Sequence, residues 1–194
     1  MATSNQAKVR EYKHLLHSLP FELVSLAEQG ITTAVSEVGG SLEENARLKA
    51  TTLAAQSQLM ALADDSGLEV DALGGEPGPL SARYAGEGAS DRDRLNYLLV
   101  RLKGVPWERR SARFRCVIAI ATPDGEVELC SGECRGVITF EPKGRHGFGY
   151  DPVFYLPELG KTMAELPLEI KNQISHRGQA ARQACQWLRR KYNL

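Results

Sequence analysis

Two neighbouring aspartates are the residues of this sequence best suited to chemistry. Asp64 and Asp65 follow the apolar run 59–63, and Ser66 and Gly67 come next. The apolar run predicts a buried strand that ends at Asp64, and open α/β sheets bind ligands at such strand ends. Two carboxylates at one strand end are costly unless a cation lies between them. Mg²⁺ favours oxygen ligands of this kind and usually arrives with a phosphate substrate.

A second group of candidate residues lies near the first residue of the chain. Thr3, Ser4 and Asn5 precede a predicted helix, and Lys8 falls in its first turn. Free backbone amides and a cation at a helix N-terminus form a site for an anion such as phosphate. The alternative is an ordinary helix cap with a solvated lysine. The pattern of a Walker A loop is absent.

A third group surrounds the segment 44–50, which reads Glu-Asn-Ala-Arg-Leu-Lys-Ala. Ser41 begins a capping box, which predicts a helix from there to about residue 58. Lys49 on this helix could reach back to a phosphate, although a surface charge is the alternative. Glu37 lies in the loop before the helix and by itself is an ordinary loop acid.

A fourth group begins with the glycine-rich segment 147–152, which reads Gly-Phe-Gly-Tyr-Asp-Pro. Phe148 between two glycines can expose a ring face for stacking on a purine, although such an aromatic is more often part of the core. Three hydrogen-bond donors follow in the sequence: Lys171, His176 and Arg177. Donors match the O6 and N7 acceptors of a 6-oxopurine. Adenine presents an N6 donor there and would leave protein donors unpaired.

The elements that must position these residues alternate between helix and strand patterns. This alternation favours an α/β fold in one domain that covers residues 1–194. Helices are expected after the capping residues Asn5, Ser41, Ser90 and Ser175. Strands are expected at 21–26, 59–64, 114–120, 127–134 and 137–140, with a Pro-Asp-Gly turn at 123–125 closing a hairpin.

The composition excludes several classes of function. The chain has 24 basic and 24 acidic side chains, so we expect no nucleic acid polymer as a partner. No apolar run is long enough to span a bilayer and no signal segment is visible, which predicts a soluble, cytoplasmic protein without a membrane partner. The four cysteines form no C-x-x-C pair, which favours reduced thiols over zinc ligands or disulfides.

The four groups, in their order and spacing, resemble the motifs of the inosine triphosphate pyrophosphatase family from Thr3 to about Ala180. The motifs are the [ST]-x-N-x-x-K run, Glu-Asn-Ala-x-x-Lys-Ala, Asp-Asp-Ser-Gly, Gly-Phe-Gly-Tyr-Asp-Pro and Ser-His-Arg-Gly. In the family an apolar strand of several residues precedes the first motif, whereas only Met1 and Ala2 precede it here. Either that strand is shortened or the true start lies upstream.

The resemblance implies a fold, a reaction and partners. The implied fold is an α/β protein with a long, twisted mixed sheet flanked by helices, in two lobes with a central nucleotide cleft. The implied reaction is Mg²⁺-dependent hydrolysis of ITP, dITP and XTP to the monophosphate and pyrophosphate, which cleanses the nucleotide pool. A homodimer is also implied.

The resemblance further implies roles for single residues. Asp65 matches the catalytic acid, and Glu37 together with Asp65 would hold Mg²⁺ while Asp65 activates or orients a water for attack at the α-phosphorus. The residues expected to bind the nucleotide are Thr3, Ser4, Asn5, Lys8, Lys49, Ser66, Phe148, Gly149, Tyr150, Asp151, Lys171, His176 and Arg177. Among these, Lys8 and Lys49 would stabilise charge on the departing pyrophosphate.

Two other functions stay open at this point. One is a related pyrophosphatase that acts on modified pyrimidine or methylated nucleotides. The other is a nucleotide-binding regulator that has lost catalysis, which metal-dependent release of pyrophosphate would exclude. The preference among ITP, XTP and their deoxy forms is also open, as is the rejection of GTP, because guanine presents the same O6 and N7 acceptors.

Overall fold

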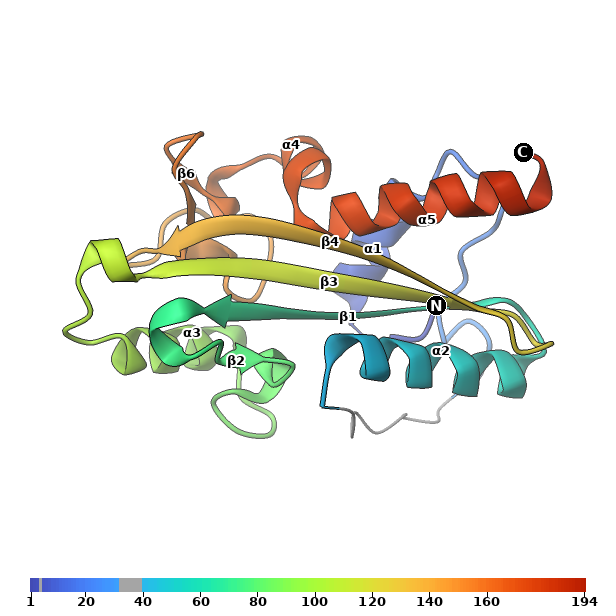
Figure 1. The fold of residues 1–194 in the computed structure, drawn as a ribbon, viewed down its shortest axis with the longest axis horizontal. Helices are drawn as coiled ribbons and strands as arrows, with labels where there is room; N and C mark the ends of the chain where they lie inside the picture. The colour runs from blue at the N-terminus through green and yellow to red at the C-terminus, as the bar shows by residue number, and fades with distance from the viewer. Residues whose placement is uncertain (4, 32–39) are drawn as a thin grey trace. The chain divides into compact units, whose positions relative to one another are not determined.

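The computed structural model describes residues 1–3, 5–31 and 40–194 (Figure 1). Its helices are α1 (Gln6–Leu15), α2 (Leu42–Ser57), α3 (Asp91–Arg101), α4 (Leu168–Ile174) and α5 (His176–Tyr192). Its strands are β1 (Ala61–Val70), β2 (Pro77–Gly78), β3 (Ser111–Ala121), β4 (Val127–Ile138), β5 (Phe154–Leu156) and β6 (Lys161–Thr162). The expected α/β class is confirmed.

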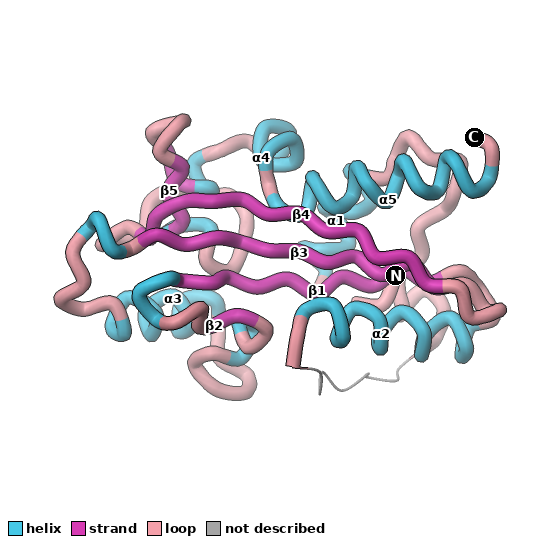
Figure 2. Tube along the Cα trace, in the orientation of Figure 1, coloured by secondary structure: helices cyan, strands magenta, loops and turns pink. Residues whose placement is uncertain are grey.

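The six strands form one sheet in the order β2-β1-β3-β4-β5-β6 (Figure 2). The pairs β1–β2, β4–β5 and β5–β6 are antiparallel, whereas we had expected a mixed sheet. β3 and β4 are joined by the expected turn, in which the Thr122 amide donates to the Glu126 carbonyl at 3.0 Å. Antiparallel strands can be joined by a short turn without a crossover helix, as β3 and β4 are here.

The contacts divide the chain into two compact units. Unit 1 contains Met1–Asp65, Cys116–Gly132 and Arg177–Leu194. Unit 2 contains Ser66–Arg115 and Glu133–His176.

Unit 1 has a core on each face of its part of the sheet. On one face Leu62 packs with apolar residues of α1 and α5, including Tyr12 and Leu188. On the other face Ala61 and Ala63 pack with α2. Because successive side chains of a strand point to opposite faces, this alternation also decides where the residues after Ala63 point.

Unit 2 is built around one core, in which the α3 residues Leu95 and Leu98 pack with β1, β3, β4 and β5. Gly67 shows how closely β2 approaches β1 in this unit. A Cβ atom at Gly67 would lie 2.3 Å from the carbonyl oxygen of Gly78, so only glycine fits there. Gly67 is therefore a position of close backbone approach within a strand.

Residues 21–26 do not form the expected strand. The Met1 amino group donates to the Val24 carbonyl at 2.6 Å, and the Ala2 amide donates to the Leu62 carbonyl at 2.8 Å. Leu23 instead packs against the core formed with α1 and α5. The apolar pattern of this segment therefore reports burial rather than strand structure.

All four cysteines are free, and Cys185 alone among them is not fully buried. Among the described residues, none of the helices combines the length and the hydrophobicity needed to cross a membrane.

Candidate functional site

The two aspartates lie in the middle of β1, and not at the end of a strand as the sequence suggested. β1 continues to Val70 because Leu68 and Val70 alternate into the core of unit 2. Consecutive strand residues point to opposite faces, so Asp64 points toward α1 and α5 while Asp65 points toward α2. The two carboxylates therefore lie on opposite faces of the strand, and each contacts a lysine of its own. Our expectation that a single cation lies between them is wrong.

On the Asp65 side of the strand, α2 supplies two donors. Lys49 Nζ lies 2.7 Å from Asp65 Oδ1, and Asn45 Nδ2 donates to Asp65 Oδ2 at 3.1 Å. Asn45 and Lys49 are four residues apart, which places them on one helix face. The Ser41 side chain caps this helix by accepting from the Glu44 amide, as the capping box predicted. We call the group of Asn45, Lys49 and Asp65 the Asp65 face.

On the other side, Asp64 contacts two cations from two helices. Lys8 Nζ of α1 lies 2.7 Å from Asp64 Oδ1, and Arg177 Nε of α5 donates to Asp64 Oδ2 at 3.4 Å. Arg177 also donates through Nη1 to Glu11 Oε2 at 2.7 Å. Glu11 follows Lys8 by three residues and lies on the same side of α1. We call this group the Asp64 face. It consists of Lys8, Glu11, Asp64, Arg177 and Cys116, which is described below.

The Asp64 face is buried, and burial fixes its protonation. Burial and the charge of Asp64 raise the pKa of the Cys116 thiol to about 12. The same two causes raise the pKa of Tyr12, whose hydroxyl lies 3.6 Å from Cys116 Sγ, well above its ordinary value. Burial disfavours the Arg177 cation, but the carboxylates of Asp64 and Glu11 outweigh this and hold the pKa of Arg177 above its usual range. Near neutral pH the thiol and phenol are therefore uncharged and the guanidinium is charged.

In unit 2 the glycine-rich segment closes around Asp151. Asp151 Oδ2 accepts from the Phe148 amide at 2.9 Å and from Lys171 Nζ at 2.7 Å. Lys171 Nζ also lies 4.9 Å from the centre of the Phe148 ring, a cation–π contact. Gly147 has a φ of +74°, and a Cβ atom there would lie 2.0 Å from Asp151 Oδ2. The loop therefore needs glycine at this position to let Asp151 fold back on it.

The neighbouring predicted residues are held by other contacts within unit 2. The Gly149 amide donates to Asp91 Oδ2 at 2.7 Å, and the buried Tyr150 donates its hydroxyl to the Ser81 carbonyl at 2.9 Å. The His176 ring stacks on Phe114 with centroids 4.7 Å apart and an interplanar angle of 15°. Tyr150 anchors the loop, while a role of His176 in reading a base stays a prediction.

The first predicted group folds as a helix cap. Asn5 Oδ1 accepts from the amides of Ala7 and Lys8 at 2.9 and 3.3 Å, and Thr3 Oγ1 accepts from the Asn5 amide at 3.2 Å. An anion at this helix terminus would therefore have to compete with the Asn5 side chain for the backbone amides. Lys8 is thus the group of this segment best able to bind a phosphate. Ser4 and Glu37 lie outside the described residues.

Several residues of these clusters escaped the sequence analysis as site residues. They are Glu11, Tyr12, Asn45, Phe114 and Cys116. The helical spacing of Glu11 from Lys8 and of Asn45 from Lys49 is the signal that could have found two of them. The sequence carried no signal for Cys116, because its position next to Asp64 depends on strand pairing.

A divalent cation suits the carboxylate chemistry of this region, since Mg²⁺ favours oxygen donors. Among the described residues, no three side chains of His, Cys, Asp or Glu are grouped as metal ligands. Asp65 is thus the described carboxylate that fits the expected metal, and its expected companion Glu37 lies outside the described part of the chain.

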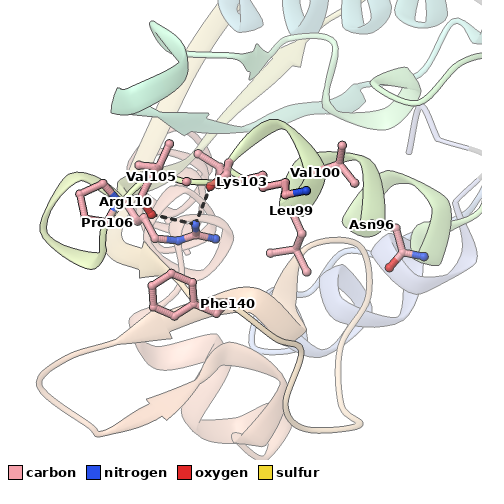
Figure 3. A pocket seen from close by; sticks show the side chains of 10 residues that line it. Asn96, Leu99, Val100, Lys103, Val105, Pro106, Arg110 and Phe140 are labelled. Carbon is pink, nitrogen blue, oxygen red and sulfur yellow. Dashed lines mark hydrogen bonds between the residues drawn. The ribbon is translucent and has the colours of Figure 1, made fainter.

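A surface pocket of about 620 Å³ in unit 2 contains none of the predicted site residues (Figure 3). It lies beside the end of α3 and is lined by Leu99, Val100 and Phe140 among others. Arg110 in its wall donates to the carbonyls of Leu102 at 3.0 Å and Thr139 at 2.8 Å, and its guanidinium lies 4.5 Å from the centre of the Phe140 ring. These contacts tie the end of α3 to the end of β4, so we assign the pocket a structural origin.

Comparison with known proteins places this geometry in a family. The model of the Ham1 family matches residues 1–187. The chain is 50% identical over 192 residues to the dITP/XTP pyrophosphatase of Desulforamulus reducens, covering 99% of this chain and 96% of that protein. It is 53% identical over 180 residues to the dITP/XTP pyrophosphatase of Geobacter sulfurreducens, covering 93% of this chain and 90% of that protein.

Solved structures show the same similarity in three dimensions. The Ham1 protein of Coxiella burnetii matches with a TM-score of 0.88 at 41% identity, covering 97% of this chain and 96% of that one. The Ham1 protein of Staphylococcus aureus matches with a TM-score of 0.87 at 42% identity, covering 98% and 97%. The family resemblance carried by the sequence motifs is confirmed, and this chain belongs to the Ham1 family.

Proposed function

We propose that this protein hydrolyses the deaminated purine nucleoside triphosphates dITP, ITP and XTP to the monophosphate and pyrophosphate. Near full-length relatives at about half identity carry the name dITP/XTP pyrophosphatase. The observation in this chain that carries the proposal is the buried Asp65 with Lys49 at 2.7 Å, a carboxylate and a cation in the motifs expected for water activation and phosphate binding. A regulator without catalysis has no need of this pair.

In the proposed reaction, Asp65 accepts a proton from a water molecule whose oxygen bonds to the α-phosphorus. The bond between the α-phosphorus and the oxygen that bridges to the β-phosphate breaks, and pyrophosphate leaves with that oxygen. Lys8 and Lys49 stabilise the charge that develops on the leaving group. Their position on two different helices allows them to contact different phosphates.

We propose Mg²⁺ as the cofactor, held by Asp65 and Glu37. Bound there, it would neutralise phosphate charge and lower the pKa of a coordinated water. The oxygen donors of these two residues are of the type that Mg²⁺ favours.

For the base, we propose that Phe148 stacks on the purine and that Lys171 and His176 supply donors to its O6 and N7 atoms. Arg177, which we expected to share this role, is held by Asp64 and Glu11, and its part in reading the base stays a prediction. Support comes from the Phe148 ring, which is half-buried and whose loop is fixed by Asp151. We further propose that the protein is a homodimer in the cytoplasm, where the nucleotide pool is. Light scattering after gel filtration tests the first point, and cell fractionation tests the second.

The function is tested by measuring pyrophosphate release from dITP, XTP, GTP and ATP, each with and without Mg²⁺. We expect release from dITP and XTP that depends on the metal and exceeds release from ATP. Release from modified pyrimidine or methylated nucleotides in preference to dITP would instead support the related pyrophosphatase. No release from any nucleotide with Mg²⁺ or Mn²⁺ would contradict an enzymatic function.

The base site is tested by Phe148→Ala in the same panel. Loss of a stacking platform should raise KM for all purine substrates alike, by the equivalent of about 1–3 kcal/mol, because every base has a π-face. Phe140→Ala is the matched control, since Phe140 is an exposed aromatic of unit 2 outside the proposed site. An unchanged KM in Phe148→Ala would place the stacking surface elsewhere.

A further inference from the structure

We propose that Lys49 couples the binding of a divalent cation at Asp65 to the binding of the triphosphate. In this view Lys49 is a positioning residue that keeps the Asp65 carboxylate neutralised until a phosphate draws the lysine away. The inference rests on the proposed function, because it concerns the same carboxylate.

The first observation is that both oxygens of Asp65 have a donor. Lys49 Nζ lies 2.7 Å from Oδ1, and Asn45 Nδ2 lies 3.1 Å from Oδ2. A metal ion that binds Asp65 must therefore share the carboxylate with these donors or replace one of them. Of the two, Lys49 carries a charge that opposes a second cation, whereas the Asn45 amide is neutral.

The second observation is that Lys49 is more exposed to solvent than Asn45. The Lys49 side chain is 11% exposed, and its flexible four-carbon stem allows the ammonium to reach a nearby anion. Asn45 is only 1% exposed and is held in the core on the inner side of α2. The charged donor of Asp65 is thus also the more exposed one.

The third observation separates Asp65 from its neighbour. Asp64 is paired with Lys8, but it also contacts the buried Arg177, which is fixed from its other side by Glu11. Moving Lys8 to a phosphate would still leave Asp64 with a permanent cation. Moving Lys49 removes the cation that contacts Asp65 at 2.7 Å and keeps the neutral Asn45 amide, so we expect the Asp65 carboxylate to gain affinity for a metal.

The consequence is a reciprocal coupling. A phosphate that takes up Lys49 strengthens metal binding at Asp65, and by linkage a metal at Asp65 strengthens phosphate binding by the same factor. Metal alone should therefore bind weakly, and metal with triphosphate should bind tightly.

The experiment measures Mn²⁺ binding by the loss of its free electron paramagnetic resonance signal at pH 8. Inorganic phosphate, a weak ligand of Mn²⁺ in solution, is the anion. For the wild-type protein we expect phosphate to tighten Mn²⁺ binding. For Lys49→Met we expect Mn²⁺ alone to bind about tenfold or more tightly than to wild type, because a neighbouring opposite charge shifts proton binding to a carboxylate by one to three powers of ten. Phosphate should no longer add to this affinity.

Three further variants define the result. Lys49→Arg keeps the charge and should show the wild-type affinity for Mn²⁺ and the wild-type effect of phosphate on it. Lys13→Met removes an exposed lysine paired with Glu28 at 3.3 Å and should leave both unchanged. Lys49→Met combined with Asp65→Asn should lose the gained affinity. If Lys49→Met does not fold, Lys49→Gln serves instead, because it keeps a donor to Asp65 and removes the charge.

Mn²⁺ affinity that is the same in wild type and Lys49→Met would overturn the proposal, as would an equal gain in Lys13→Met. The nucleotide panel is a separate readout. Hydrolysis of dITP without coupling would defeat this inference alone, and coupling without hydrolysis of dITP would defeat the proposed function alone.

Discussion

The Asp64 face and the Asp65 face are one residue apart in the sequence and differ in almost every physical respect. The Asp64 side chain is 0% exposed and contacts two cations, one of which is the buried Arg177. The Asp65 side chain is 7% exposed and contacts one cation and one amide. The first face includes a second carboxylate, Glu11, while the second has no further acid among its described contacts.

The difference shows how a strand can separate two tasks. A one-residue step along β1 turns the side chain to the opposite face, where different helices supply the partners. A carboxylate paired with a fixed, buried guanidinium can be protonated or can leave its partner only at a large cost in free energy, which suits a structural role. A carboxylate whose charged partner can move away is available for a proton or a metal. We therefore expect Asp64 to serve mainly stability and Asp65 mainly chemistry.

The largest expected effect is that of Asp65→Asn on activity. The change keeps the shape of the side chain but removes the charge that accepts a proton, so kcat for dITP should fall by a factor on the order of 10²–10⁴. Stability should change less than in Asp64→Asn, because the cation left behind is Lys49, which is more exposed than the Arg177 that Asp64→Asn leaves behind. Steady-state pyrophosphate release and urea unfolding provide the two measurements.

Asp124→Asn is the matched control for this change, since Asp124 lies in the β3–β4 turn and bonds to Thr122. It should keep wild-type kcat. If Asp65→Asn retains more than about a tenth of wild-type kcat, which is well above the range for a lost general base, Asp65 has no part in proton transfer.

The next largest effect is expected for Asp64→Asn, which should lower stability more than activity, the reverse of Asp65→Asn. It leaves Arg177 with Glu11 as its remaining acidic partner, so a net positive charge is buried among α1, β1 and α5. The free energy of unfolding should fall by about 3 kcal/mol, at the lower end of the cost of breaking a buried ion pair. Urea unfolding at pH 7 measures this loss. An Asp64→Asn protein as stable as wild type but as inactive as Asp65→Asn would remove the distinction between the two faces.

Much of this arrangement could be predicted from the sequence. The caps at Asn5, Ser41 and Ser90 are local signals, and all three cap helices in the structure. Two residues that the motifs singled out, Lys49 and Asp65, lie 2.7 Å apart in the structure, while their roles in catalysis and binding stay predictions.

The rest depended on pairing between distant segments. No local pattern indicated that Asp64 and Asp65 lie inside a ten-residue strand, since Ser66 and Gly67 are typical of a turn. Only the approach of β2 shows why glycine is needed there. The partners of Arg177 were also invisible, because Glu11 is 166 residues away in the chain. Local patterns report helices and caps, whereas ion pairs across such separations follow from the tertiary fold.

The smallest expected effect is a loss of stability at alkaline pH, which tests whether water reaches the Asp64 face. The pKa of Cys116 is raised from 9.0 to about 12 by burial and by Asp64. Below pH 9 the thiol is neutral in both the folded and the unfolded protein, so its contribution to stability is complete. As pH rises from 9 toward 12 only the unfolded state ionises, and stability is lost. Between pH 8 and pH 10 this thiol alone should lower the free energy of unfolding by about 1 kcal/mol. Urea unfolding of wild type and Cys116→Ala at both pH values measures this loss of stability, and the variant should lose less by that amount.

Cys185→Ala, which removes a half-buried thiol of unit 1, is the control and should retain most of the loss of stability seen in wild type. An equal loss in wild type and Cys116→Ala would mean that water reaches Cys116, and Asp64 would then be no more sealed than Asp65.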